Sequence, residues 1–330
     1  LTSTQVDKLY NTGYTDITAP ANVGISSIIA NSTSTLTVIA TATDTESGLD
    51  PAPYWFAETS GNPGGASSTS WQASTTFVNS GLSANTQYTY QVQARDAAGN
   101  VSAFSSSTSK YTLANQVTGL SVVNATTSST SKVSLTWTNQ SQSGVKIEQD
   151  TNCDGYETTL YDSSSTTPSS PYQVSTSANT CYKFRISSYN VDGTLNTTST
   201  PETSQITTPP AQPTGLTNTS ATATSITWSW NSVASSTGYK VYDSANNLLT
   251  TIGTATSNWT QSPLSTNTQY SIYVRATNTN GEGIASSPAS AYTSANAPTS
   301  PSHSDISTST ITWTWQSGGA QQTYYAWTTS

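Results

Sequence analysis

Asn85-Thr86-Gln87-Tyr88 is a short pattern that this chain repeats as Asn179-Thr180-Cys181-Tyr182 and Asn267-Thr268-Gln269-Tyr270. The copies follow one another at intervals of about 90 residues, and a fixed interval of that size indicates one small domain repeated along the chain. Tandem domains of this kind usually hold other parts of a protein together or apart. The repeat therefore says more about architecture than about a target.

A second pattern keeps step with the first and shows that the repeats are built of strands. Ile226-Thr227-Trp228-Ser229-Trp230 alternates apolar and hydroxyl side chains, as residues 133–137 and 311–315 also do. Successive side chains on a strand point to opposite faces, so the apolar set of each segment faces one way. No long pattern of helical period appears. The sequence predicts an all-β protein of tandem antiparallel β-sandwiches arranged end to end.

The composition fits a folded extracellular protein. Only 8% of the 330 residues are charged, yet the chain has nine Trp and 18 Tyr, which disordered sequences lack. A net charge of -8 with nine scattered basic residues argues against nucleic acid, which needs clustered Lys and Arg. No stretch approaches the ~18 continuous apolar residues of a membrane span. We expect a cell-surface or secreted location.

The chain resembles tandem fibronectin type III domains, and its first repeat resembles a bacterial Ig-like relative. That family carries a Trp on the second strand, matched here by Trp137, Trp228 and Trp313. It also carries a Tyr near the start of the sixth strand, matched by the Tyr of each recurring pattern. The first repeat departs from the family because its segment 36–42 has no Trp. The resemblance implies about seven strands in two sheets for each complete repeat.

Proline-bearing stretches mark the predicted boundaries, because Pro cannot join a central strand ladder. The last segment supplies only the first three strands of a sandwich. Either the chain is a section of a longer array, or another molecule completes this half-domain with Trp313, Trp315 and Trp327 as assembly contacts. The predicted parts are an N-terminal extension or last strand of a preceding repeat at 1–19, an Ig-like or fibronectin type III-like domain at 20–114, fibronectin type III-like domains at 115–209 and 210–297, and the incomplete domain at 298–330.

A disulfide is expected from the layout that the resemblance implies. Cys153 follows the third strand and Cys181 opens the sixth, so both positions lie at one end of the sandwich. They are the only cysteines in the chain, and a bond between them indicates an oxidising compartment. The alternative is a pair of free buried thiols. A zinc site is not expected, because the single His, His303, lies far along the chain.

Two acidic segments are candidate sites for Ca²⁺, the one cofactor that the sequence suggests. Asp150, Asn152 and Asp154 place oxygen atoms on alternate residues before a Gly, as the first half of a calcium loop does. Tyr161 stands where such a loop carries its Glu. The alternative is a hairpin turn in which Asn, Asp and Gly serve left-handed backbone angles.

The second candidate lies in the first repeat. Asp44 and Glu46 fall between the predicted second and third strands, and Asp96 falls in the loop between the last two. Those loops share one end of a sandwich, so the three carboxylates could meet. Ordinary solvated turns are the alternative interpretation.

Glycosylation is a further expectation, since Asn-x-Ser/Thr sequons are frequent in this chain. Chance is the alternative, because so Ser/Thr-rich a sequence forms sequons freely. The candidate positions are Asn31, Asn100, Asn124, Asn139, Asn196, Asn218 and Asn258.

Exposed aromatic rings can stack on sugars, but strand alternation points most Trp residues of this chain inward. Trp71, Trp259 and Tyr242 are freer, and no pair among them stands out as a binding platform.

Catalysis has little support in the sequence, which has no nucleophile elbow and no phosphate loop. We expect a non-catalytic extracellular spacer array, structural or adhesive, in a larger cell-surface protein or filament. Its sandwiches of about 35 Å would stand in line. Its partners would be other copies of itself or the remainder of a longer chain, and cell-surface glycans. The alternative is a set of accessory modules, spacer or carbohydrate-binding, of a secreted polysaccharide-degrading enzyme.

Overall fold

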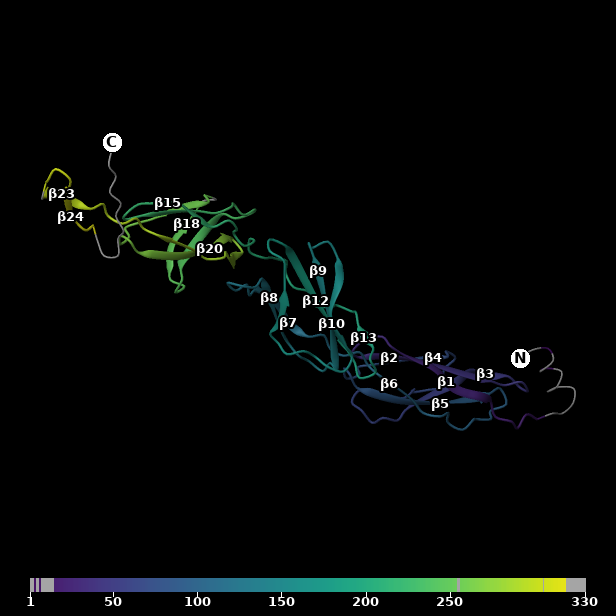
Figure 1. The fold of residues 1–330 in the computed structure, drawn as a ribbon. Coiled ribbons are helices and arrows are strands. Elements are labelled where there is room, and N and C mark those ends of the chain that lie inside the picture. Colours follow the sequence, from purple (N-terminus) through teal and green to yellow (C-terminus); the bar gives the residue numbers. More distant parts are fainter. Residues whose placement is uncertain (1–2, 4–5, 7–14, 254–255, 305, 319–330) are drawn as a thin grey trace. The chain divides into compact units, whose positions relative to one another are not determined.

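The named elements of the chain, β1 to β24, are all strands (Figure 1). The structure is a computed structural model that describes residues 3, 6, 15–253, 256–304 and 306–318. The strand pairings whose register is resolved are all antiparallel. Because the named elements are all strands, the predicted all-β fold is confirmed. Contacts group the chain into two compact units, of which the first holds Leu1–Val122, Leu135–Tyr172 and Lys183–Gln205, and the second Val123–Ser134, Gln173–Tyr182 and Ile206–Ser330.

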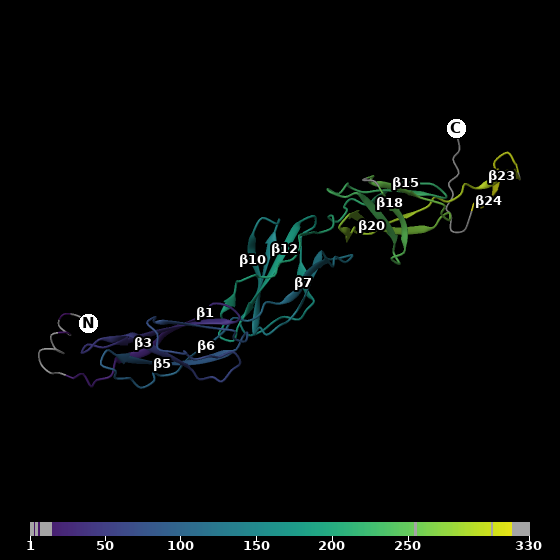
Figure 2. The ribbon, with the colours of Figure 1, turned by 180° about the vertical axis from the view of Figure 1, so that it is seen from behind.

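The first repeat forms two three-stranded sheets, whose strands lie side by side in both Figure 1 and Figure 2. One sheet has the order β1-β2-β4 and the other β3-β5-β6. The strands are β1 (Ala21–Ala30), β2 (Thr35–Thr43), β3 (Leu49–Glu58), β4 (Thr76–Ser80), β5 (Gln87–Asp96) and β6 (Thr108–Tyr111).

The core of the first repeat explains how it manages without the recurring Trp. Leu36 and Val38 on β2 are fully buried, and Val38 stands where the other repeats carry Trp. Phe77 on β4 pairs with Val38 across the sheet and stacks on the buried Phe56 with ring centroids 5.4 Å apart. The stacked Phe56 and Phe77 thus pack in a core in which Val38 takes the place of the indole.

The second repeat has a three-stranded sheet in the order β11-β8-β7 and a larger one in the order β10-β9-β12-β13, with β14 also paired to β12. Leu135, Trp137, Phe184 and Ile186 are buried, as the alternation predicted. The strands are β7 (Thr118–Asn124), β8 (Lys132–Thr138), β9 (Gly144–Thr151), β10 (Tyr156–Ser163), β11 (Tyr172–Ser175), β12 (Cys181–Tyr189), β13 (Leu195–Asn196) and β14 (Ile206–Thr207).

The third repeat reproduces that plan, with sheets in the orders β15-β16-β19 and β18-β17-β20-β21, and with β22 paired to β20. Trp228 and Trp230 are buried in its core beside Tyr239 and Val274. The strands are β15 (Thr217–Ala221), β16 (Ile226–Ser229), β17 (Gly238–Asp243), β18 (Leu248–Ile252), β19 (Asn258–Gln261), β20 (Gln269–Asn278), β21 (Gly281–Ala285) and β22 (Ala289–Tyr292).

The first repeat differs from the other two at one sheet edge. It has no regular strand equivalent to β10 or β18. Residues 59–75 cross this edge with an isolated bridge from Tyr54 to Gln72 and with irregular hydrogen bonds that join Ser67 and Ser68 to β3. The segment Gly61-Asn62-Pro63-Gly64-Gly65 explains the difference, because Gly and Pro both weaken a strand ladder.

The last described segment is a two-stranded sheet of β23 (Thr299–Ser304) and β24 (Thr312–Gln316). Trp313 and Trp315 on β24 are 56% and 42% exposed. Trp327, the third predicted assembly contact, lies outside the described residues. Within the described part of the chain, no helix has the length and apolarity that a bilayer crossing needs.

Candidate functional site

The recurring pattern builds the same turn in each repeat. Its Tyr lies near the start of β5, β12 or β20, and its hydroxyl accepts a hydrogen bond from the backbone N–H of a Ser five residues earlier. The pairs are Ser83–Tyr88 at 2.8 Å, Ser177–Tyr182 at 2.8 Å and Ser265–Tyr270 at 2.9 Å. This bond is the tyrosine corner of sandwich folds. The pattern therefore needs Tyr for its hydroxyl as well as for its ring.

A buried Thr completes each turn, and sequence reasoning missed it because Thr is abundant throughout the chain. In the first repeat, the Thr112 hydroxyl accepts from the Thr86 backbone N–H at 3.1 Å and donates to the Ser83 carbonyl at 2.7 Å. The equivalent residues are Thr208 and Thr293, which make the same two bonds. All three Thr residues are at most 2% exposed. Each turn is thus held by side chains from two distant segments.

The segment that follows β6 is bound by amide side chains of the next repeat, within the first compact unit. Asn190 Nδ2 donates to the Thr112 carbonyl at 3.0 Å, and Asn196 Nδ2 donates to the Ala114 carbonyl at 2.9 Å. Both Asn side chains are buried. Buried polar groups that are fully paired specify one arrangement, because leaving either partner unpaired is unfavourable.

The structure brings together two of the three predicted calcium ligands of the first repeat. Carboxylate oxygens of Asp44 and Asp96 lie within 4.8 Å of each other and of Asp16, which sequence reasoning missed. Glu46 is not a member of this group. Asp16 precedes β1, and its Oδ2 accepts a hydrogen bond from the Ser47 backbone N–H at 3.1 Å. No local pattern links residues so far apart in the chain, so only the fold identifies Asp16.

Three carboxylates this close repel one another unless nearby donors or a cation offset their charge. Backbone N–H groups offset part of the negative charge. Asp44 Oδ1 accepts a hydrogen bond from the Gly48 N–H at 2.6 Å, and Asp96 Oδ1 accepts one from the Asn100 N–H at 2.8 Å. Burial acts to raise the pKa of Asp16, but hydrogen bonds led by Ser47 outweigh it and the pKa is lowered. A cluster of carboxylate oxygens of this kind has the chemistry that Ca²⁺ prefers.

The acidic segment of the second repeat is the hairpin turn between β9 and β10. Asp150 Oδ1 accepts from the backbone N–H groups of Asp154 at 2.9 Å and Gly155 at 3.0 Å, and Asn152 has a φ of 69°. These bonds favour the turn interpretation. Carboxylate oxygens of Asp150, Asp154 and Glu157 also lie within 4.8 Å of one another, so Glu157 joins two of the predicted ligands. The calcium interpretation of both groups stays a prediction.

The predicted disulfide is confirmed. Cys153 in the β9–β10 turn and Cys181 at the first position of β12 are both disulfide-bonded, and the chain has no other cysteine. The bond ties a hairpin turn to a strand of the same sheet.

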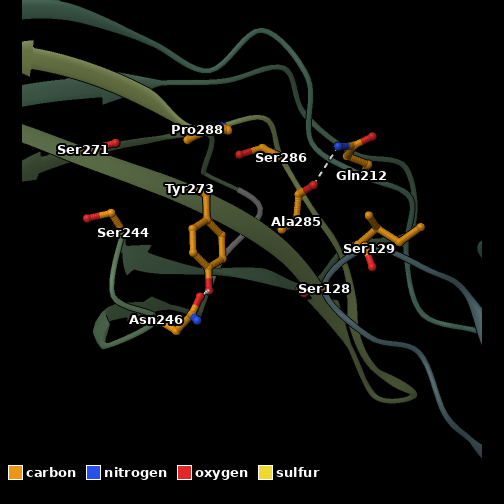
Figure 3. Close-up of a pocket in the computed structure, with 11 residues that line it drawn as sticks. Ser128, Ser129, Gln212, Ser244, Asn246, Ser271, Tyr273, Ala285, Ser286 and Pro288 are labelled. Carbon is orange, nitrogen blue, oxygen red and sulfur yellow. Dashed lines mark hydrogen bonds between the residues drawn. The ribbon is translucent and has the colours of Figure 1, made fainter.

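A hollow of about 620 Å³ opens beside β20 of the third repeat (Figure 3). The Tyr273 hydroxyl donates to Asn246 Oδ1 at 2.9 Å at one side of it. Gln212 Nε2 donates to the Ala285 carbonyl at 2.6 Å at the other. The lining is uncharged and rich in Ser. Such a lining suits a neutral, hydroxyl-bearing ligand better than an ionic one.

Two aromatic pairs were not evident from the sequence. Trp71 packs on Trp55 with ring centroids 6.0 Å apart, and the Arg95 guanidinium lies 4.9 Å from the Trp71 ring. Tyr242 stacks on Tyr273 at 5.2 Å with an interplanar angle of 9°. The pairing of β17 with β20 brings Tyr242 opposite Tyr273, and the isolated bridge from Tyr54 to Gln72 brings Trp71 beside Trp55.

The sequons differ in exposure. Asn196 is the least suitable acceptor, because it is 3% exposed and its amide is bonded to the Ala114 carbonyl. Asn100 and Asn124 are half-buried. The exposed candidates are Asn31, Asn139, Asn218 and Asn258.

Residues 211–292 match the fibronectin type III domain family. This segment contains Trp228, the tyrosine corner of Tyr270 and the sheets of the third repeat. The second repeat has the same strand orders. The chain is a tandem fibronectin type III-like domain protein, as the resemblance of its sequence implied.

Among curated proteins, Exoglucanase B of Cellulomonas fimi is 31% identical to this chain over an alignment of 250 residues, and the match covers 69% of this chain and 22% of that protein. The chain thus spans less than a quarter of the length of this relative. Among solved structures, the chicken CNTN1 FN1-FN3 domains are 15% identical, cover 83% of this chain and 98% of their own, and have a TM-score of 0.28. The Family 28 exopolygalacturonase of Yersinia enterocolitica is 20% identical, with 26% of this chain and 20% of its own covered, and a TM-score of 0.24.

Proposed function

We propose that this chain is a non-catalytic spacer of a secreted or cell-surface protein, in which successive sandwiches are coupled through bound linkers. The observation that supports this most is the pairing of Asn190 and Asn196 with the carbonyls of Thr112 and Ala114. Domains joined by a free tether move independently by default. Buried hydrogen bonds to the linker backbone oppose that motion, which is what a spacer requires.

An ion pair at the same junction adds to this coupling. Lys110 Nζ lies 3.2 Å from Asp192 Oδ2, and the Tyr111 backbone N–H donates to the same oxygen at 3.0 Å. Both charged side chains are about a quarter to a third exposed, so the pair contributes at most about 1 kcal/mol. The buried amides therefore carry most of the specificity.

The similarity to Exoglucanase B favours one setting for the spacer: accessory modules of a secreted polysaccharide-degrading enzyme. A hydroxyl-rich surface of few charges and a disulfide suit such an extracellular setting. A structural or adhesive role in a cell-surface protein or filament is the other setting, and the coupling of repeats serves both.

Incubation of the purified chain with swollen cellulose tests the non-catalytic part of the proposal. We expect no release of reducing ends above buffer, and sustained release would overturn it. Cosedimentation in the same samples tests the carbohydrate-binding alternative, which a saturable bound fraction would favour.

Trypsin tests the coupling, because Lys110 lies beside the bound linker. Replacing Asn190 and Asn196 together with Ala removes both linker bonds, and we expect faster cleavage after Lys110. Asn218→Ala is the matched control, since Asn218 is an exposed Asn of the third repeat. Equal cleavage in all three proteins would contradict the bound linker.

A further inference from the structure

We propose that Asn85 and Asn179, the Asn residues of the first two recurring patterns, are the residues by which one sandwich recognises the next. The partner that they fit is a neighbouring sandwich of the same kind, through the loop that precedes its third strand. This inference rests on the proposed spacer function and assigns that function to a named side chain.

At the first junction, the amide of Asn85 bridges two loops of the second repeat. Its Nδ2 donates to the carbonyl of Ser141 in the β8–β9 loop, and its Oδ1 accepts from the backbone N–H of Val191 in the β12–β13 loop at 2.9 Å. One amide thus satisfies an acceptor and a donor on separate loops. All three residues belong to the first compact unit.

At the second junction, the equivalent Asn contacts the equivalent loop, through a Ser hydroxyl in place of a Ser carbonyl. Asn179 Nδ2 donates to Ser235 Oγ, in the β16–β17 loop, at 3.1 Å. Ser141 and Ser235 hold the same place, since each lies three residues before the Gly that begins β9 or β17. Both partners at this junction belong to the second compact unit. The same pattern residue therefore reaches the same loop position at both junctions.

The left-handed backbone of the turn accepts both Asn and Gly, so it does not by itself require the amide side chain. Asn85 and Asn179 both have a φ of 50°, and Asn267 has a φ of 49°, in the left-handed region that Gly adopts more readily. The pattern's Thr and Tyr bond within their own turn. The Asn side chain is the member of the pattern that bonds to the following repeat, and Gly would lose those bonds.

Amide hydrogen exchange of the full chain, measured by NMR, tests this role. Asn85→Gly keeps the left-handed turn and removes the amide, so we expect the Val191 N–H to exchange faster by about tenfold as its acceptor is lost. The Ser83 N–H, which bonds to Tyr88 inside the turn, should change less than about twofold.

Two further variants separate recognition from simple loss of stability. Asn22→Gly is the matched control, because Asn22 also has a positive φ, 53°, and its amide bonds to Thr43 within its own repeat. It should leave Val191 unchanged. Asn85→Asp keeps the oxygen that accepts from Val191 and loses the donor to Ser141. It should preserve slow exchange at Val191, and it keeps the test valid if Asn85→Gly unfolds the repeat.

The inference is overturned if Asn85→Gly leaves Val191 unchanged, if it accelerates Ser83 equally, or if Asn22→Gly has the same effect on Val191. Its failure is distinct from failure of the spacer proposal. If Val191 does not respond but the Asn190 and Asn196 variant still exposes Lys110 to trypsin, the spacer proposal stands and only the recognition role of Asn85 falls.

Discussion

Trp228 and Trp313 hold the same place in their repeats and have opposite surroundings. Trp228 is fully buried, with its Nε1 donating to Gln261 Oε1 at 3.1 Å, whereas Trp313 is 56% exposed. The local sequence around the two residues is nearly the same. At the scale of single residues, the sequence pattern places each Trp on a strand. How much stability the indole contributes depends on how many other strands pack around that Trp.

Trp228→Ala should lower the free energy of unfolding of the third repeat by about 3 to 5 kcal/mol, because it leaves a large cavity and an unpaired Gln261. Trp313→Ala, the matched control, should change it by less than about 0.5 kcal/mol. Urea unfolding followed by circular dichroism measures both. Equal effects would show that Trp228 does not fill a core.

Tyr90 gives the first repeat a dependence on alkaline pH. Burial raises the pKa of Tyr90 to about 12, above its usual value of 10.0, although Asn79 donates a hydrogen bond to its hydroxyl. Because the folded pKa is the higher one, the stability from the neutral phenol is full below pH 10 and is lost as the pH rises towards 12. Melting temperatures should fall more steeply across this window in the wild type than in Tyr90→Phe. If the melting temperatures of the two proteins fell in parallel with rising pH, Tyr90 would not be the source of this pH dependence.

At the scale of elements, the β9–β10 hairpin shows how a local turn becomes part of a sheet. Asp150 shapes the turn through its bonds to Asp154 and Gly155, and the disulfide of Cys153 and Cys181 ties the turn to β12. The turn is local in sequence, and the disulfide is not. The turn bonds therefore stabilise the folded hairpin, whereas the disulfide acts mainly by restricting the unfolded chain.

Replacing Cys153 and Cys181 together with Ser should lower the free energy of unfolding by about 3 kcal/mol. The bond closes a loop of about 28 residues, and opening it restores the freedom of the unfolded chain. Urea unfolding of the variant, and of the wild type with reductant, measures the effect. The third repeat, which has no cysteine, serves as the internal control and should unfold as before.

The acidic group of Asp16, Asp44 and Asp96 leads to a prediction for calcium. Millimolar CaCl₂ should raise the melting temperature of the first repeat, since a ligand that binds only the folded state stabilises it. Asp16→Asn should reduce this rise, and Asp192→Asn, outside both acidic groups, should not. If the wild type shows no rise, the calcium interpretation of this group is wrong.

At the scale of the whole molecule, the property that matters for a spacer is the length that its repeats reach in line. From the sequence we expect three complete sandwiches in line, each about 35 Å long. The maximum dimension in solution should then be about 100 Å. Small-angle X-ray scattering measures this dimension directly. A compact particle of the same mass would contradict the spacer proposal, whichever extracellular setting the chain serves.

The sequence by itself determined the repeat, the strands and the residues that face the core. Periodicity is sufficient for this, because alternation along a strand assigns faces and a recurring Trp or Tyr marks equivalent strands. It also predicted the disulfide, once the resemblance had placed both cysteines at one end of a sandwich. It did not predict the missing edge strand of the first repeat, where Gly and Pro outweigh the family plan.

Only the tertiary structure decided which distant residues meet. Asp16 joins Asp44 and Asp96, Thr112 completes the turn of Tyr88, and Asn85 reaches Val191, although nothing in their local sequence links them. Such contacts depend on strand pairing and loop positions between segments far apart in the chain. Local patterns report the face that a residue occupies, whereas the residue opposite it is set by how the sheets and repeats close.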